Sequence, residues 1–268
     1  MKEIFTMQYN ANKDMGITRE KAFEILKSFA NEIRKTNRHH PPMEIIVVGG
    51  GSILLNYQFR ESTHDFDVLV RSDSDIKETV YKVAEQYNLP DNWMNTDFKK
   101  TNSFSNKLRD VSEHRASYNN GRLEIRTVKD EYLIAMKMVS AREYRNDISD
   151  IAGIIQASKA ENNDIPFDII KNAVEYLYGS SPQIKDHIWQ AVEDFTKMDA
   201  IKLAEVYCSI RSEEKALSVK LTDIDHKYPG MIKEENLQEV INGIKKGLSK
   251  TNIDNTENET ERRKRTIR

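Results

Sequence analysis

Features that define several classes of protein are scarce or missing in this sequence. The 268 residues contain one cysteine, Cys208, so an internal disulfide cannot form and a disulfide-stapled fold is excluded. No stretch approaches the ~20 apolar residues of a membrane span. Residues 1–15 carry charges without an apolar run, unlike a secretory signal. We therefore expect a cytoplasmic protein with no membrane partner.

An excess of charge of one sign is also missing. Lys and Arg number 41 against 43 Asp and Glu, which gives a net charge of −2. Such a chain has no whole-molecule attraction for nucleic acid, so contact with RNA would need a local basic patch. The run Arg262–Arg265 is one candidate, but runs of this kind in tails are often only solvated.

Apolar periodicity divides the chain into a mixed first half and a helical second half. Hydrophobic residues make up 38 % of the chain and recur at helix or strand spacing, which is typical of a globular protein. From Ile148 to about residue 249 only helix signals recur. The elements predicted before that point are a helix from Thr18, a strand at 44–48, a helix over 52–57, a strand at 66–70, a helix capped at 72–74 and continuing to Tyr87, a strand at 122–128, and a helix from Asp130 to about Tyr144.

This order predicts a mixed α/β fold of the α+β kind, in which a small mixed sheet is followed by a helical C-terminal region. We expect a first domain at residues 1–155 that includes the N-terminal helix, and a helical domain at 156–249. Residues 250–268 lack periodic apolar residues and are predicted to form a disordered tail. Residues 88–120 are too polar and irregular to predict an element there.

Two aspartates at the start of the second strand form the strongest candidate site. Residues two apart in a strand project to the same side, so Asp65 and Asp67 present both carboxylates together, about 6 to 7 Å apart along the chain. Two adjacent carboxylates repel each other, and a bound Mg²⁺ or Mn²⁺ would relieve that repulsion while bridging nucleotide phosphates. For an arbitrary pair of this kind, a solvated strand edge is the alternative.

A glycine-rich turn precedes the aspartates by thirteen residues. Without Cβ atoms, Gly49, Gly50 and Gly51 allow backbone N–H groups to approach a phosphate at the N-terminus of the next helix. The hydroxyl of Ser52 can add a hydrogen bond. We therefore expect these four residues to bind the phosphates of a nucleotide.

Together the two motifs resemble the nucleotidyltransferase superfamily, whose pattern is an hG[GS] turn followed by Dh[DE]h. The turn Val48-Gly49-Gly50 matches the first part, and Asp65-Phe66-Asp67-Val68 matches the second. The resemblance spans about residues 47–155 and implies a nucleotidyltransferase fold for the first domain.

More specifically, the chain is similar to the bacterial group that includes abortive-infection toxin nucleotidyltransferases. In that group an arginine and a threonine commonly precede the aspartates, as Arg60 and Thr63 do here. A lysine on a later helix is followed by a basic-Asp-x-x-Asp segment, as Lys137 is followed by Asp147 and Asp150.

The superfamily resemblance implies a third carboxylate on a strand beyond the aspartates. That group helps to hold the catalytic metal or activates the incoming hydroxyl, and Glu124 matches the position, where aspartate is commoner. We therefore expect Asp65, Asp67 and Glu124 to be the catalytic residues and the metal ligands. The alternative for Glu124 is an exposed strand charge paired with Arg122 or Arg126.

Lys137 lies in an apolar run, where a charge without a partner would be costly to bury. The resemblance implies that it binds nucleotide phosphates, and the alternative is an ion pair with Asp147 or Asp150. Asp147 also suits the N-cap of the following helix. For Arg60, Arg142 and Asp147, both a phosphate-related role and a structural role stay open.

The resemblance implies a metal-dependent enzyme that moves a nucleoside monophosphate from an NTP to an acceptor and releases pyrophosphate. The toxin relatives imply that the acceptor is tRNA or another RNA, and that an antitoxin protein is a partner. The alternative is a catalytically inactive member of a toxin–antitoxin pair that binds nucleotide or RNA. Glu124 separates the two, because two aspartates can bind a metal without it.

Overall fold

The computed structural model describes residues 16–36, 42–71, 76–180 and 182–247, and it divides into two compact units. The larger unit holds the described residues up to Ala141 together with Asp147–Cys208, and the smaller holds Arg142–Asn146 and the described residues from Ser209 onward. The predicted boundary at residue 155 falls inside α5 (Asp147–Ala160), within the larger unit. The predicted tail at 250–268 lies outside the described residues.

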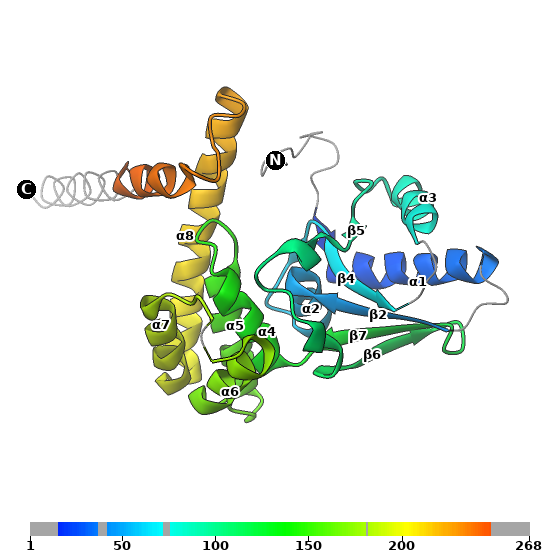
Figure 1. The fold of residues 1–268 in the computed structure, drawn as a ribbon, viewed down its shortest axis with the longest axis horizontal. Helices are drawn as coiled ribbons and strands as arrows, with labels where there is room; N and C mark the ends of the chain where they lie inside the picture. The colour runs from blue at the N-terminus through cyan, green and yellow to red at the C-terminus, as the bar shows by residue number, and fades with distance from the viewer. Residues whose placement is uncertain (1–15, 37–41, 72–75, 181, 248–268) are drawn as a thin grey trace, which may run out of the picture. The chain divides into compact units, whose positions relative to one another are not determined.

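Helices and strands alternate in the first half and helices follow, which confirms the predicted mixed α/β class (Figure 1). The strands are β1 (Ile17–Thr18), β2 (Met43–Val48), β3 (Ser62–Thr63), β4 (Phe66–Arg71), β5 (Met94–Asn95), β6 (Ser112–Tyr118) and β7 (Leu123–Val128). Besides α5, the helices are α1 (Arg19–Thr36), α2 (Gly49–Asn56), α3 (Lys77–Tyr87), α4 (Asp130–Ser140), α6 (Phe167–Tyr178), α7 (Asp186–Lys197) and α8 (Ala200–Lys227), with 3-10 turns η1 (Asp97–Lys100) and η2 (Asn106–Arg109).

Five strands form a mixed sheet in the order β5-β4-β2-β7-β6. The central strand β2 runs antiparallel to β4 and parallel to β7, and the two edge strands pair parallel to β4 and antiparallel to β7. The short strands β1 and β3 pair separately, with Ile17 opposite Thr63. This pairing holds the segment that leads into β4.

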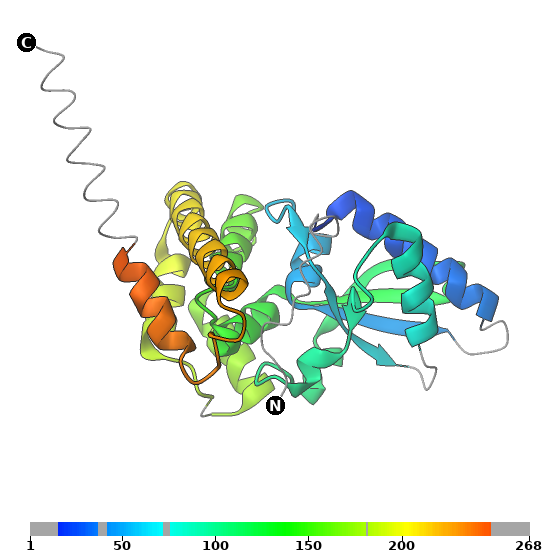
Figure 2. The same ribbon diagram turned by 90° about the horizontal axis from the view of Figure 1, so that it is seen from above.

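One face of the sheet packs on the main hydrophobic core. Alternate residues of the three central strands, such as Val47, Val68 and Ile125, are fully buried on this face against apolar residues of α1, α2 and α3. Helices α1 and α3 lie side by side over it (Figures 1 and 2). The other residues of each strand, among them Asp67, project from the opposite face.

Three local features differ from the sequence-based expectation. Helix α2 begins at Gly49, so the glycines form its first turn instead of a turn before it. Helix α4 ends at Ser140, because Ala141 takes a left-handed conformation with φ of 35°. The stretch without a predicted element contains β5 and β6, and the β6 sequence SEHRASY lacks the apolar alternation that would have revealed it.

The second half of the larger unit is a group of helices in which α4 packs against α5 and α6, and α5 against α7. In the smaller unit, Leu217, Leu221, Ile232 and Ile241 form a separate apolar cluster. Among the described residues, none of the helices combines the length and the apolar character that crossing a membrane requires.

The first residue of α4, Asp130, is half-buried, and its carboxyl group accepts a hydrogen bond from the Tyr57 hydroxyl. Burial raises the pKa of Asp130 to about 6, and the nearby Glu113 adds to this effect, whereas the hydrogen bond from Tyr57 partly opposes it. Near neutral pH the folded protein must therefore ionise a carboxyl group in an unfavourable place.

Replacing Asp130 by Asn should remove a pH-dependent loss of stability. Folding raises the pKa of Asp130 from 3.8 to about 6, so between these values the folded state keeps a proton that the unfolded state has released. The stabilisation is present below the unfolded pKa and is lost as the pH rises through the folded pKa, by about 3 kcal/mol in all. In urea denaturation, the free energy of unfolding of Asp130→Asn relative to that of the wild type should therefore increase from acidic to neutral pH.

Tyr57→Phe provides the control for this experiment. It removes the hydrogen bond that lowers the pKa of Asp130, so it should extend the loss of stability to higher pH. A free-energy difference between Asp130→Asn and the wild type that stays constant with pH would contradict the assignment.

Candidate functional site

The carboxylate of Asp67 lies at the N-terminus of α2. Asp67 is the second residue of β4 and pairs with Val48, the last residue of β2. Gly49 begins α2, and a Cβ atom added there would lie 3.6 Å from Oδ2 of Asp67. The first turn of α2 has no acidic residue and no side-chain cap. The positive end of the helix dipole therefore attracts negative charge to this place.

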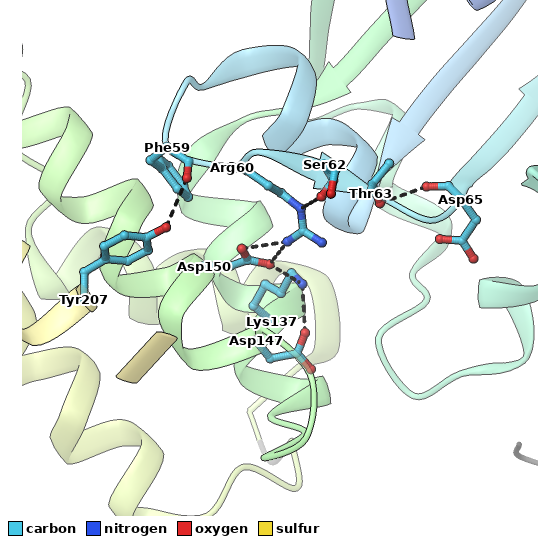
Figure 3. Close-up of polar contacts among 9 residues, drawn as sticks. All are labelled: Phe59, Arg60, Ser62, Thr63, Asp65, Lys137, Asp147, Asp150 and Tyr207. Carbon is cyan, nitrogen blue, oxygen red and sulfur yellow. Dashed lines mark hydrogen bonds and ion pairs between the residues drawn. The ribbon is translucent and has the colours of Figure 1, made fainter. Parts of the chain in front are cut away.

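Asp65 lies just before β4 in a braced segment. The hydroxyl of Thr63 donates a hydrogen bond of 3.1 Å to the main-chain oxygen of Asp65 (Figure 3). Thr63 is itself buried, and Phe66 on the other side of Asp65 is fully buried in the core. Both aspartates are half-buried and flank this core residue. Their catalytic and metal-binding roles stay predictions.

The glycine-rich segment divides into an accessible and a buried part. Gly49 and Gly50 are partly exposed, whereas Gly51 and Ser52 are buried. A Cβ atom at Gly51 would lie 2.9 Å from the Phe66 ring, so this glycine allows α2 to pack against β4. The Ser52 hydroxyl is fully buried and makes no hydrogen bond to a described residue. The expected phosphate contacts of Gly51 and Ser52 are therefore not available in this structure.

The strand register corrects the prediction for Glu124. Glu124 pairs with Glu44 at the start of β2, whereas Asp67 pairs with Val48 at its end. At a rise of about 3.3 Å per residue, four residues of strand put roughly 13 Å between these two levels. Glu124 therefore does not share a metal ion with the aspartates.

Glu124 has partners of its own at the far end of the sheet. It accepts a hydrogen bond from Ser117 Oγ at 2.6 Å, and His114 Nε2 lies 3.0 Å from its Oε2. This arrangement is closer to the alternative prediction, in which Glu124 is a charge on an exposed strand face. Its partners, however, are Ser117 and His114 of β6 and not Arg122 or Arg126. Within the described part of the chain, no three acidic, His or Cys side chains gather in one place.

Lys137 belongs to a buried network of charges. Its Nζ atom lies 2.8 Å from Asp147 Oδ1 and 2.8 Å from Asp150 Oδ2 (Figure 3). Arg60 Nη1 contacts both oxygens of Asp150, at 2.7 and 2.5 Å. Both aspartates are at most 1 % exposed. Lys137 therefore forms ion pairs with both aspartates that were considered as partners.

The charges of this network balance. Burial by itself lowers the pKa of Lys137, but attraction to Asp147 and Asp150 outweighs it and holds the pKa above the ordinary value. Lys137 is therefore ionised at neutral pH, and two cations face two carboxylates. Two of the three N–H groups of the ammonium are occupied by carboxylates.

Arg60 links this network to α2. Besides Asp150, its Nε donates to the main-chain oxygen of Ser62 at 3.2 Å. A Cβ atom at Gly50 would lie only 2.6 Å from Arg60 Nη2. Glycine at this position therefore lets the Arg60 guanidinium lie against the first turn of α2. Its Nη1 atom has a structural role in the pair with Asp150, and its Nη2 atom lies where a phosphate contact was considered.

The residue before Arg60 is held by the helices. A Cβ atom at Gly153 of α5 would lie 2.6 Å from the Phe59 ring, so the ring packs directly on the helix backbone. The hydroxyl of Tyr207 donates to the main-chain oxygen of Phe59 at 3.1 Å (Figure 3). Sequence patterns did not predict these contacts, although a glycine inside a helical run is a signal of close packing.

Arg142 is exposed and belongs to the smaller unit. It has interactions within the protein. Its role, in phosphate binding or in the structure, stays a prediction.

Comparison with known families identifies one match. Residues 24–197, more than half of the chain, match the family described as "Nucleotidyltransferase of unknown function (DUF6036)". The chain therefore belongs to this nucleotidyltransferase family. The matched region contains the glycine-rich turn, both strand aspartates and the buried charge network. No curated protein and no solved structure matches the chain.

Replacing Lys137 by Met should destabilise the protein strongly. The change removes the ammonium group that pairs with both buried carboxylates, and removing one member of a buried ion pair typically costs about 3–5 kcal/mol. Urea denaturation measures the free energy of unfolding. Lys197→Met is the matched control, because Lys197 also pairs with a carboxylate but its side chain is 65 % exposed. Equal losses in the two variants would contradict the proposed network.

Proposed function

We propose that this protein is a metal-dependent nucleotidyltransferase that moves a nucleoside monophosphate from an NTP to an acceptor. The observation that carries the proposal is the Asp67 carboxylate at the N-terminus of α2, beside Asp65, in a chain of a nucleotidyltransferase family. A carboxylate suited to a cation and a helix N-terminus suited to a phosphate thus occur at one place.

The two aspartates suit Mg²⁺ or Mn²⁺. Mg²⁺ is usually bound by one or two carboxylates together with substrate phosphates and water, so a third carboxylate is not needed. Asp65 and Asp67 would hold the ion, which when bound would neutralise charge on the triphosphate. The side chain of Asp65 makes no hydrogen bond to a described residue, which leaves both of its oxygens available.

Gly49, Gly50 and Arg60 are the groups that we propose for the triphosphate. The two glycines are the accessible members of the first turn of α2, and Arg60 Nη2 lies against this turn. Lys137 would contribute its remaining N–H group to the same phosphates. Its two ion pairs keep its charge near the site without a ligand.

In the transfer step an acceptor hydroxyl attacks the α-phosphorus of the NTP. A bond forms between the acceptor oxygen and this phosphorus, the bond to the β-phosphate bridging oxygen breaks, and pyrophosphate leaves. We assign the proton of the hydroxyl to Asp65. The guanidinium of Arg60, held by Asp150, stabilises charge on the leaving group.

RNA is the acceptor that we propose, with tRNA as the first candidate, because the motifs resemble toxin-type nucleotidyltransferases. An antitoxin protein and a cytoplasmic location belong to the same proposal. A second candidate function is binding of nucleotide or RNA without turnover in a toxin–antitoxin pair. The position of Glu124, far along the sheet from Asp67, favours this second candidate, since the expected third carboxylate is not at the site.

Incubation with α-³²P-labelled NTPs, Mg²⁺ and total cellular RNA tests transfer directly. We expect label on RNA from α-labelled but not from γ-labelled NTP, because the γ-phosphate leaves with pyrophosphate. Asp67→Asn should lower the rate by on the order of 10²–10³, the loss seen when one charge-stabilising group is removed from an active site. Asp91→Asn, at an exposed aspartate, should leave the rate unchanged.

The same experiment separates the two candidate functions. Nucleotide that binds in the presence of Mg²⁺ without labelling RNA, protein or small acceptors would support the binding function and overturn transfer. An Asp67→Asn variant that transfers label as fast as the wild type would remove Asp67 from the site.

A further inference from the structure

Asn95 lies beside Asp67 in the sheet. The edge strand β5 consists of two residues and runs parallel to β4, with Met94 paired to Phe66 and Asn95 paired to Asp67. Paired residues of neighbouring strands project from the same face, with strands about 4.8 Å apart. Burial agrees with this placement, because Met94 is buried in the core and Asn95 is half-buried.

Trp93 fixes the position of this short strand. Its main-chain oxygen accepts a hydrogen bond of 2.7 Å from Phe66 N, and its indole Nε1 donates to Val80 of α3 at 3.0 Å. The ring is fully buried and packs edge-on against Phe66, with ring centroids 6.1 Å apart. Phe66 lies between Asp65 and Asp67 in the sequence. The contacts of Trp93 with Phe66 therefore also fix the position of Asn95 relative to the two aspartates.

The amide of Asn95 is oriented but not saturated. Its Oδ1 accepts a hydrogen bond from the main-chain N–H of Asp97 at 2.9 Å, and its Nδ2 donates to the main-chain oxygen of Asn92 at 3.4 Å. An amide oxygen can accept a second bond and the amide nitrogen has a second hydrogen. The turn therefore fixes the group and leaves one acceptor and one donor.

Two residues pair with Asp67 in the sheet, Asn95 on one side and Val48 on the other. The second strand neighbour of Asp67 is Val48, which is apolar. Asp97 lies close in sequence, but its carboxylate is 70 % exposed and pairs with Lys100 at 2.7 Å. Among the residues paired with Asp67 in the sheet, Asn95 is thus the polar one.

We propose that Asn95 is the third side chain of the metal and nucleotide site, supplying a neutral oxygen to the cation directly or through its bound water. The inference rests on the proposed function and extends it. Amide oxygens are ordinary ligands of Mg²⁺ and Mn²⁺. With an amide at this position, the acidic side chains of the site carry the charge of two carboxylates. A third carboxylate would make the site bind a cation more tightly in the absence of nucleotide.

Two substitutions separate this role from a purely structural one. Asn95→Leu keeps the size of the side chain and removes both polar atoms. Asn95→Asp keeps an oxygen that can accept from the N–H of Asp97, so the turn is preserved, and it adds a charge beside Asp67. If Asn95 served only the turn, aspartate would act on a bound cation only through space, and the cation would bind less tightly than it would to a carboxylate that ligates it.

The test is Mn²⁺ binding, followed by the electron paramagnetic resonance signal of the free ion, with and without α,β-methylene ATP. We expect Asn95→Leu to weaken binding of Mn²⁺ with this nucleotide analogue by about 10–100-fold, as for other supporting groups of metal sites. Asn95→Asp should tighten binding of Mn²⁺ alone by about tenfold through the added charge. Asn102→Leu, at an exposed asparagine, should match the wild type.

The outcomes distinguish this inference from the proposed function. If Asp67→Asn weakens Mn²⁺ binding while Asn95→Asp and Asn95→Leu both match the wild type, the role of Asn95 is wrong and the aspartate site stands. If Asn95→Leu weakens binding but Asn95→Asp does not tighten it, Asn95 serves the turn alone. If Asp67→Asn binds Mn²⁺ as the wild type does, the aspartate site fails and the role of Asn95 fails with it.

Discussion

The antiparallel pairing of β2 with β4 is the constraint on which the candidate site depends. It puts Asp67 opposite Val48, and the chain turns into α2 at the next residue, so the carboxylate meets the helix N-terminus. Burial of Phe66 and Val68 specifies this register, because a slip by one residue would move both into solvent and Asp67 into the core. The same register brings β5 to the other side of Asp67. Hydrophobic burial thus positions the polar groups.

The buried charges of Arg60, Lys137, Asp147 and Asp150 add a second constraint. Taking such groups out of water is costly, and a well-paired set returns little net stability, but loss of one member is severe. These four residues therefore contribute little to the net free energy of folding, but they favour a single geometry. In this geometry α4 and α5 orient the guanidinium of Arg60 against the first turn of α2. Segments far apart in the sequence thereby meet at the first turn of α2.

Local patterns allowed most of the first half to be predicted. The runs around Val47 and Val68 have the composition of buried strands, and α1 begins near Thr18 as its cap predicted. Strand β6 could not be predicted, because its polar sequence gains its conformation from pairing with β7 at the sheet edge. Likewise β5 is too short to leave a periodic signal, so Asn95 escaped notice. Asp150 was considered as a partner of Lys137, but its pairing with Arg60 could not be predicted, because the two residues lie 90 positions apart in the sequence.

The sequence by itself determined the class of fold, the two aspartates around a core residue, and the glycines before them, since these follow from spacing along one strand and one turn. Only the tertiary structure decided which residues of neighbouring strands pair with one another in the sheet. It removed Glu124 from the aspartates although its strand was predicted correctly, and it buried Gly51 and Ser52 while leaving Gly49 and Gly50 accessible. The physical reason is that register and helix orientation are set by packing between distant segments, which no local pattern contains.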